Sequence, residues 1–205
     1  NVVYIGQEKY RGMYNTPELL LLGENVSDET LLEAKKLVTP HDVVNMQYTS
    51  GTTGFPKGVM LTHYNVVNNG KAIGDCMDLS TADRLMIQVP MFHCFGMVLS
   101  MTSCMTHGAT LCPMPYFSAK VSLACINQER ITCFNGVPTM FIAMFNHPDY
   151  KKTDFSYMRT GIMAGSPCPV KVMQDVVDKI HMNEITIVYG QTESSPGCTQ
   201  SHVDD

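Results

Sequence analysis

The sequence has no run of lysine and arginine anywhere along its 205 residues. Its 14 Lys and Arg residues are outnumbered by 19 Asp and Glu residues, which gives a formal net charge of −5 and an isoelectric point near 5.8. Proteins that bind nucleic acid take much of their affinity from clustered cations that neutralise phosphates. We therefore expect no nucleic-acid partner.

Paired cysteines are also missing. The sequence contains no CxxC pair and no cysteine with histidines at zinc-binding spacing. Its eight cysteines are spread over the chain, at Cys76, Cys94, Cys104, Cys112, Cys125, Cys133, Cys168 and Cys198. Because disulfides persist mainly in oxidising compartments, this spacing predicts reduced thiols in an intracellular protein, cytoplasmic if bacterial and compatible with mitochondria if eukaryotic.

Long apolar runs and a signal peptide are absent as well. No acidic or basic residue occurs from Leu85 to Ala119, yet prolines, glycines and His93 interrupt this segment before it reaches the roughly 20 apolar residues of a spanning helix. We expect a buried core there and no transmembrane segment, while peripheral membrane contact and the oligomeric state stay open. The start at Asn1, without Met and inside the apolar run "VVYI", suggests an excised piece.

Short β-branched runs alternate with longer segments of helical period, which predicts an α/β fold with a mostly parallel sheet flanked by helices. We expect strands at 42–48, 84–89, 109–112, 131–134, 161–164 and 185–189. We expect helices at 27–38, 62–77, 96–108, 118–129, 138–146 and 169–180, with Ser27 capping the first. Residues 1–205 are interpreted as one partial domain, with a peripheral helix and connector over about 1–40 and a nucleotide-binding core over about 41–205.

One stretch, "YTSGTTGFPKGVMLTH" at 48–63, concentrates glycines, hydroxyl groups and one cation. It matches neither the Walker loop, which needs Gly-Lys followed by Ser or Thr, nor the GxGxxG dinucleotide fingerprint. Hydroxyls, backbone amides and an ammonium in one loop suit the β- and γ-phosphates of a nucleotide, although solvated turns have a similar composition. The candidate phosphate ligands are Thr49, Ser50, Gly51, Thr52, Thr53, Gly54 and Lys57.

These residues resemble a known family. "YTSGTTGFPKG" at 48–58 is similar to the signature loop of the adenylate-forming (AMP-binding) superfamily, and "YGQTESSPG" at 189–197 is similar to its Tyr-Gly-x-Thr-Glu motif. Between them, "PMFHCFG", "GVPT" and "AGSPCP" resemble intermediate motifs. The residues of these motifs are most similar to those of medium-chain acyl-CoA synthetases of the family-member-two type and their bacterial fatty-acyl relatives. The resemblance implies an internal fragment of the large N-terminal domain.

The resemblance implies an acid-thiol ligase that forms AMP. A fatty acid would react with ATP to give an acyl-adenylate and pyrophosphate, and coenzyme A would then capture the acyl group. Because two anions meet, catalysis requires donors and a metal that neutralise charge. The family match makes Thr192, Glu193 and Lys57 catalytic candidates, with Glu193 as ligand of Mg²⁺.

The same match implies which residues bind the adenine and the acyl group. Gly165, Ser166, Pro167, Tyr189, Gly190, Gln191 and Thr192 are the candidates for the adenine and AMP. His93 and Gly136 are the candidates for the acyl pocket. Without the family match, each would be interpreted as an ordinary turn or core residue.

Two alternatives remain open. One is a module that binds ATP or pyrophosphate without turnover, and the other is adenylation of an amino or aryl acid. No acidic residue occurs around His93 or Gly136, which favours a plain carboxylic acid. The family's downstream ribose-binding Asp, its hinge and its C-terminal Lys are not in the sequence, so we expect little activity from this piece alone. Acyl chain length is not predicted.

Overall fold

We describe the protein from a computed structural model, which covers residues 2–49 and 54–205. Its contacts divide into two compact units, Asn1–Asp42 and Val43–Asp205. In the described part of the chain, the clusters of buried apolar side chains lie in the second unit. The candidate site residues of the sequence analysis also belong to the second unit.

The first unit contains two short parallel strands and two helices, β1 (Val2–Tyr4), β2 (Met13–Asn15), α1 (Thr16–Gly23) and α2 (Asp28–Leu37). The predicted cap of α2 is confirmed, because the Ser27 side chain accepts a hydrogen bond from the Thr30 N–H at 3.2 Å. A second cap, not predicted, starts α1, where Asn15 and Glu18 form a reciprocal capping box. Each cap satisfies an N–H group that a helix start would otherwise leave free.

The second unit is built on a six-stranded sheet, which confirms the predicted α/β class. Its strands are β5 (Arg84–Ile87), β6 (Thr110–Pro113), β7 (Cys133–Gly136), β8 (Thr160–Met163), β9 (Glu184–Gly190) and β10 (Gly197–Gln200). They lie in the order β10-β9-β8-β7-β5-β6, and all neighbours are parallel except the antiparallel pair β9 and β10.

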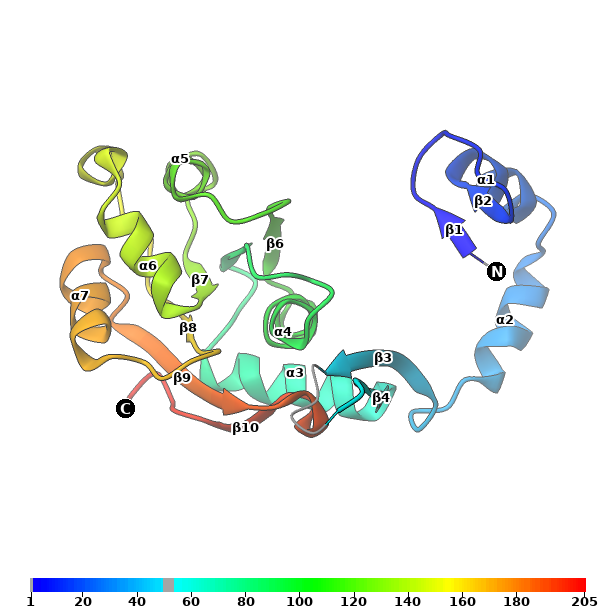
Figure 1. The fold of residues 1–205 in the computed structure, drawn as a ribbon. Helices are drawn as coiled ribbons and strands as arrows, with labels where there is room; N and C mark the ends of the chain where they lie inside the picture. The colour runs from blue at the N-terminus through cyan, green and yellow to red at the C-terminus, as the bar shows by residue number, and fades with distance from the viewer. Residues whose placement is uncertain (1, 50–53) are drawn as a thin grey trace. The chain divides into compact units, whose positions relative to one another are not determined.

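Helices cover both faces of this sheet (Figure 1). One layer contains α3 (His63–Cys76), the π-helix η1 (Phe95–Thr102) and α4 (Ser103–His107), and the other contains α5 (Ala119–Glu129), α6 (Pro138–Phe145) and α7 (Val170–Ile180). The short 3₁₀ helices η2 (Pro148–Lys152) and η3 (Thr192–Ser194) lie in connections. Such parallel strands with crossover helices bring the carboxyl ends of the strands to one edge, where ligands bind in folds of this class.

Successive residues of the central strands face opposite layers, as the pleat requires. Leu85 and Ile87 pack with α3, η1 and α4, whereas Met86 between them packs with α5, α6 and α7. Likewise, Cys133 packs on the face of α3, η1 and α4, and Phe134 packs on the face of α5, α6 and α7. The sheet therefore has an apolar core on each face, which explains its continuous apolar strands.

The strand predicted at 42–48 does not belong to this sheet. It forms β3 (Val43–Thr49) and pairs antiparallel with β4 (Lys57–Thr62) in a separate two-stranded sheet. The sequence predicts a loop and then a helix after β3, and β4 was not predicted. In β4, half-buried Val59 and buried Leu61 alternate with exposed Gly58 and Met60, which is the period of a strand.

The helix predicted at 96–108 also differs from expectation. Residues 95–102 form a π-helix, and only 103–107 form an α-helix. Ser100 and Thr102 donate side-chain hydrogen bonds to the carbonyl oxygens five residues before them, at 3.0 and 2.9 Å. π-Helices are rare and occur often near functional sites. Among the described helices, none is both long and apolar enough to cross a membrane.

Candidate functional site

Two adjoining cavities lie at the carboxyl ends of β8 and β9. The larger encloses about 450 Å³ and the smaller about 240 Å³. Gly165, Val188 and Gly190 line both of them. The cavities are therefore neighbours that share a wall at the strand ends, the edge where ligands bind in folds of this class.

The larger cavity brings together residues of two distant motifs. Gly165, Ser166 and Pro167 follow β8, while Tyr189 and Gly190 end β9. Tyr189 is 68% exposed, so one face of its ring is open to a ligand. Gly165 has a φ of +81°, a left-handed conformation that favours glycine and turns the chain away from β8.

The smaller cavity has one wall from the segment after β5 and one from the ends of β8 and β9. His93, Phe95 and Leu99 form the first wall. The second wall contains Ala164, Gly165, Val188, Gly190, Gln191, Thr192 and Pro196. Apolar carbon groups from Phe95, Leu99 and Val188 thus face the same space as the polar groups of the Tyr-Gly-x-Thr-Glu motif.

His93 is exposed, and its ring is oriented by the backbone. Its Nδ1 accepts a hydrogen bond from the Phe95 N–H at 3.1 Å, and its carbonyl oxygen accepts from the N–H groups of Gly96 and Met97 at 3.0 Å each. A neutral imidazole that accepts at Nδ1 carries its proton on Nε2. His93 can therefore offer an Nε2–H donor to a carboxylate in the smaller cavity.

The turn after β9 is fixed by close backbone packing and by hydrogen bonds. A Cβ on Gly190 would lie 2.0 Å from the carbonyl oxygen of Pro196, which also accepts from the Gln191 N–H at 2.9 Å. Across from it, the carboxamide of Asn69 on α3 bonds both the N–H and the C=O of Gly197, at 3.0 and 2.9 Å. These contacts fix the ends of the segment that carries Thr192 and Glu193.

Thr192 and Glu193 begin the short helix η3 and differ in burial. Burial raises the pKa of the Cys94 thiol, and a hydrogen bond with the Thr192 side chain partly offsets this effect. Thr192 therefore touches the residue that follows His93. Glu193 is exposed, and within the described part of the chain no three His, Cys, Asp or Glu residues gather around a common point.

The candidate phosphate loop connects β3 and β4, and β4 packs against η3. Thr49 and Lys57 are register partners at the loop end of this hairpin, and Lys57 is exposed. Gly54 is also exposed, with a φ of +138°. The four other phosphate candidates, Ser50, Gly51, Thr52 and Thr53, lie outside the described residues.

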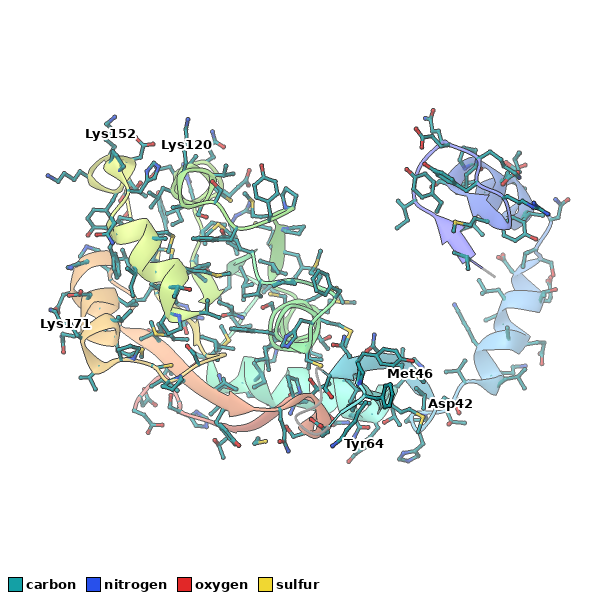
Figure 2. All side chains as sticks on the ribbon, viewed as in Figure 1. Asp42, Met46, Tyr64, Lys120, Lys152 and Lys171 are labelled. Atoms are coloured by element: carbon teal, nitrogen blue, oxygen red, sulfur yellow. The ribbon has the colours of Figure 1, made fainter. Side chains whose placement is uncertain are left out.

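Positive charge is scarce beside the cavities. None of the described residues that line the two cavities is a Lys or Arg. Lys120, Lys152 and Lys171 instead point outward from α5, η2 and α7 (Figure 2). Lys57, the cation of the sequence motif, begins β4, and β4 packs against η3.

Sequence reasoning missed several lining residues. Phe95, Ala164 and Val188 each lie within two residues of a candidate that was chosen, and Pro196 lies three residues after Glu193, so extending each motif by three positions would have found them. Leu99 carried no such signal. Gly136 is buried, with its Cβ position 2.9 Å from the Phe134 ring, and it is not among the described residues that line either cavity.

Comparison with known proteins gives a consistent assignment. Residues 9–205 match the family described as AMP-binding enzyme. The chain is 49% identical over its full length to YngI of Bacillus subtilis (strain 168), whose name describes an acyl-CoA synthetase, and covers 37% of that protein. It is 38% identical over 88% of its length to the human mitochondrial medium-chain acyl-CoA ligase ACSF2, of which it covers 31%.

A solved structure has the same fold. A fatty acyl CoA synthetase of Mycobacterium tuberculosis matches 94% of the chain with a TM-score of 0.78 and 28% identity, over 37% of its own length. The chain thus spans about a third of the length of the relatives that it matches.

Proposed function

The chain belongs to the AMP-binding enzyme family, and on this basis we propose that it forms the nucleotide-binding part of a fatty-acid CoA ligase. The carboxylate oxygen of the acid attacks the α-phosphorus of ATP, the bond to the β-phosphate oxygen breaks, and pyrophosphate leaves. The thiol of coenzyme A then attacks the acyl carbonyl and releases AMP. The observation that carries the proposal is the meeting of two distant motifs around adjoining cavities at the strand ends.

The larger cavity is proposed to hold the adenine. The exposed ring of Tyr189 offers one face for stacking, and Gly165, Ser166 and Pro167 form the opposite wall. Aromatic stacking of a base is typically worth about 1–3 kcal/mol. Because Gly165 has no side chain, the backbone can approach the base closely.

The segment from Gly190 to Glu193 is proposed to hold the α-phosphate. Gln191 and Thr192 line the smaller cavity, so that a phosphate at the shared wall would lie between adenine and acid. Charge builds on the phosphate oxygens as the acid attacks, and a hydroxyl donor such as Thr192 stabilises that charge. The Lys57 ammonium and the loop before it would neutralise the β- and γ-phosphates.

Glu193 is the proposed ligand of Mg²⁺. Its exposed carboxylate fits this ion, since Mg²⁺ keeps several waters and takes one or two carboxylates together with substrate phosphates. When bound, the ion neutralises phosphate charge. Glu193 lies next to Thr192, so both groups would act on the same end of the triphosphate.

The smaller cavity is proposed to take the carboxylate end of a fatty acid. Phe95, Leu99 and Val188 supply apolar contacts, and His93 supplies an Nε2–H donor. None of the described residues that line it is an Asp or Glu, which would pair with the amino group of an amino acid. This absence supports a plain carboxylic acid as the substrate.

Calorimetry of ATP binding tests the proposal. We expect the wild-type chain to bind ATP in the presence of Mg²⁺, and Lys57→Ala and Glu193→Gln each to weaken binding by about tenfold, which is the loss of about 1.4 kcal/mol. Glu193→Gln should also remove the dependence on Mg²⁺. Lys120→Ala, which removes an outward-facing cation on α5, is the matched control and should leave the affinity unchanged.

Equal affinities in all four proteins would contradict the assigned roles of Lys57 and Glu193. For the reaction itself, the full gene product should exchange pyrophosphate into ATP when octanoate is present. Exchange that depends on an amino acid and not on octanoate would contradict the fatty-acid assignment.

A further inference from the structure

Asn135 on β7 is a completely buried polar residue that the proposed chemistry does not use. Its side-chain nitrogen donates to the carbonyl oxygen of Leu99 and to the hydroxyl of Ser100, both at 3.1 Å. Its side-chain oxygen accepts from the Ile162 N–H at 2.9 Å. One carboxamide thus joins the π-helix η1 on its face of the sheet to strand β8.

Each of these hydrogen bonds leads to a wall of the smaller cavity. Leu99 lines the cavity itself, and the Ser100 hydroxyl donates to the carbonyl oxygen of Phe95, another lining residue, at 3.0 Å. Ile162 lies two residues before Ala164, which lines the opposite wall. A side chain behind the cavity therefore bonds to the supports of both of its walls.

The two walls depend on Asn135 to different extents. Strand β8 is held by backbone ladders to β7 on one side and to β9 on the other. Within the described residues, the hydrogen bonds that join η1 to the sheet both come from Asn135. Loss of its donor nitrogen should therefore loosen the wall of Phe95 and Leu99 and spare the wall of β8.

We propose that Asn135 is a positioning residue that holds the π-helix η1 in register with the sheet and thereby shapes the carboxylate side of the active site. The inference rests on the proposed function for its effect on substrate, and on the hydrogen bonds alone for its effect on η1. The uncommon winding of η1 is consistent with this role, because its pitch is supported by hydroxyl groups and by this amide from outside the helix.

Two substitutions test the hydrogen bonds from Asn135 to η1 separately from its other contacts. Asn135→Asp keeps an acceptor for the Ile162 N–H and removes both donors to η1. Ser100→Ala removes the hydroxyl that accepts from Asn135 and donates to the Phe95 carbonyl oxygen, but it leaves the hydrogen bond from Asn135 to the Leu99 carbonyl oxygen. It is the milder variant, in case Asn135→Asp does not fold. Thr160→Val is the matched control, since it removes a buried hydrogen bond to the Glu184 carbonyl at the amino end of β8, far along the strand from the cavity.

Steady-state kinetics of the full gene product, with octanoate and ATP as substrates, give the first readout. We expect the KM for octanoate to rise at least about fivefold in Asn135→Asp, in line with the loss of a buried hydrogen bond, with the KM for ATP unchanged. Ser100→Ala should raise the KM for octanoate by a smaller factor and also leave the KM for ATP unchanged. Thr160→Val should lower the melting temperature and leave both KM values alone. Equal changes in the two KM values would overturn the proposal.

Amide hydrogen exchange of the same variants gives a readout that does not need activity. Exchange over residues 95–102 should become faster in Asn135→Asp and Ser100→Ala and stay unchanged in Thr160→Val. An unchanged rate over 95–102 in Asn135→Asp overturns the role of Asn135 whatever the kinetics. An inactive wild type with faster exchange in Asn135→Asp would contradict the proposed function and leave the positioning role supported.

Discussion

At the scale of single residues, Gly190 shows how closely the site segments are packed. It is the last residue of β9, it lines both cavities, and its Cβ position is 2.0 Å from a backbone oxygen. Backbone cannot move aside as a flexible side chain can. The missing side chain is therefore a requirement of the turn and not only a matter of conformational freedom.

Replacement of this glycine tests that requirement. We expect Gly190→Ala to destabilise the protein by about 1–3 kcal/mol, as overpacking does, and to abolish measurable ATP binding because the segment carrying Thr192 is displaced. Gly23→Ala is the control, since nothing lies within 4 Å of its Cβ position at the end of α1. Urea unfolding and calorimetry measure the two effects, and a Gly190→Ala protein with wild-type affinity would contradict the packing argument.

At the scale of elements, an ion network joins the strands at their amino ends, opposite the site. Arg159, just before β8, donates to Asp83 at 2.9 and 3.2 Å and also pairs with Glu184 at the start of β9. Asp83, just before β5, accepts from the hydroxyl of Thr132, just before β7, at 2.8 Å. One network of hydrogen bonds thus links the amino ends of four adjacent strands.

The carboxylate of Asp83 gives this network a pH dependence. Burial alone would raise the pKa of Asp83, but hydrogen bonds from Arg159, Thr132 and Ser80 outweigh it and hold the pKa below the ordinary value of 3.8. A carboxylate with a lowered folded-state pKa stabilises the fold above the unfolded-state pKa, and this contribution is lost as the pH falls through the folded-state pKa. The network should therefore weaken only in acid.

We expect Asp83→Asn to lower the free energy of unfolding by about 3 kcal/mol at pH 7, because it leaves the Arg159 charge without its buried partner. The difference from wild type should shrink as the pH falls below about 4. Glu129→Gln, which breaks the half-exposed pair with Arg84, should cost less than about 1 kcal/mol. Urea titrations at several pH values test this, and a difference that does not vary with pH would refute it.

At the scale of the whole molecule, the second unit contains the apolar clusters found among the described residues and every candidate site residue. We propose, as the sequence suggested, that about 1–40 is a peripheral helix and connector and about 41–205 is the nucleotide-binding core. The described first unit has no buried residue in either of its helices. Its removal should therefore expose little core.

Two truncations test this division. A chain of residues 43–205 should keep its melting temperature within a few degrees and its affinity for ATP. A chain of residues 1–196 should melt at a lower temperature and lose its affinity for ATP. It lacks β10, which pairs with β9 and makes the two hydrogen bonds with Asn69. Circular dichroism and calorimetry give the comparison, and a 43–205 chain that unfolds would contradict the proposed boundary.

The sequence by itself determined the local elements. Periodicity placed the five parallel strands and most helices to within a few residues, and the Ser27 cap followed from side-chain chemistry alone. The motifs at 48–58 and 189–197 identified the family, because their glycines and hydroxyls recur in a fixed order. These features depend on residues close together in the chain, so a linear pattern is enough to recognise them.

Only the tertiary structure decided which distant residues meet. The π-helical winding at 95–102 and the contact of Asn135 with both supports of the smaller cavity depend on packing between segments far apart in sequence. Asn135 lies outside the family's motifs, and its proposed role follows only from its three hydrogen bonds. The role of a buried side-chain amide depends on its hydrogen-bond partners, and these partners cannot be identified from the sequence.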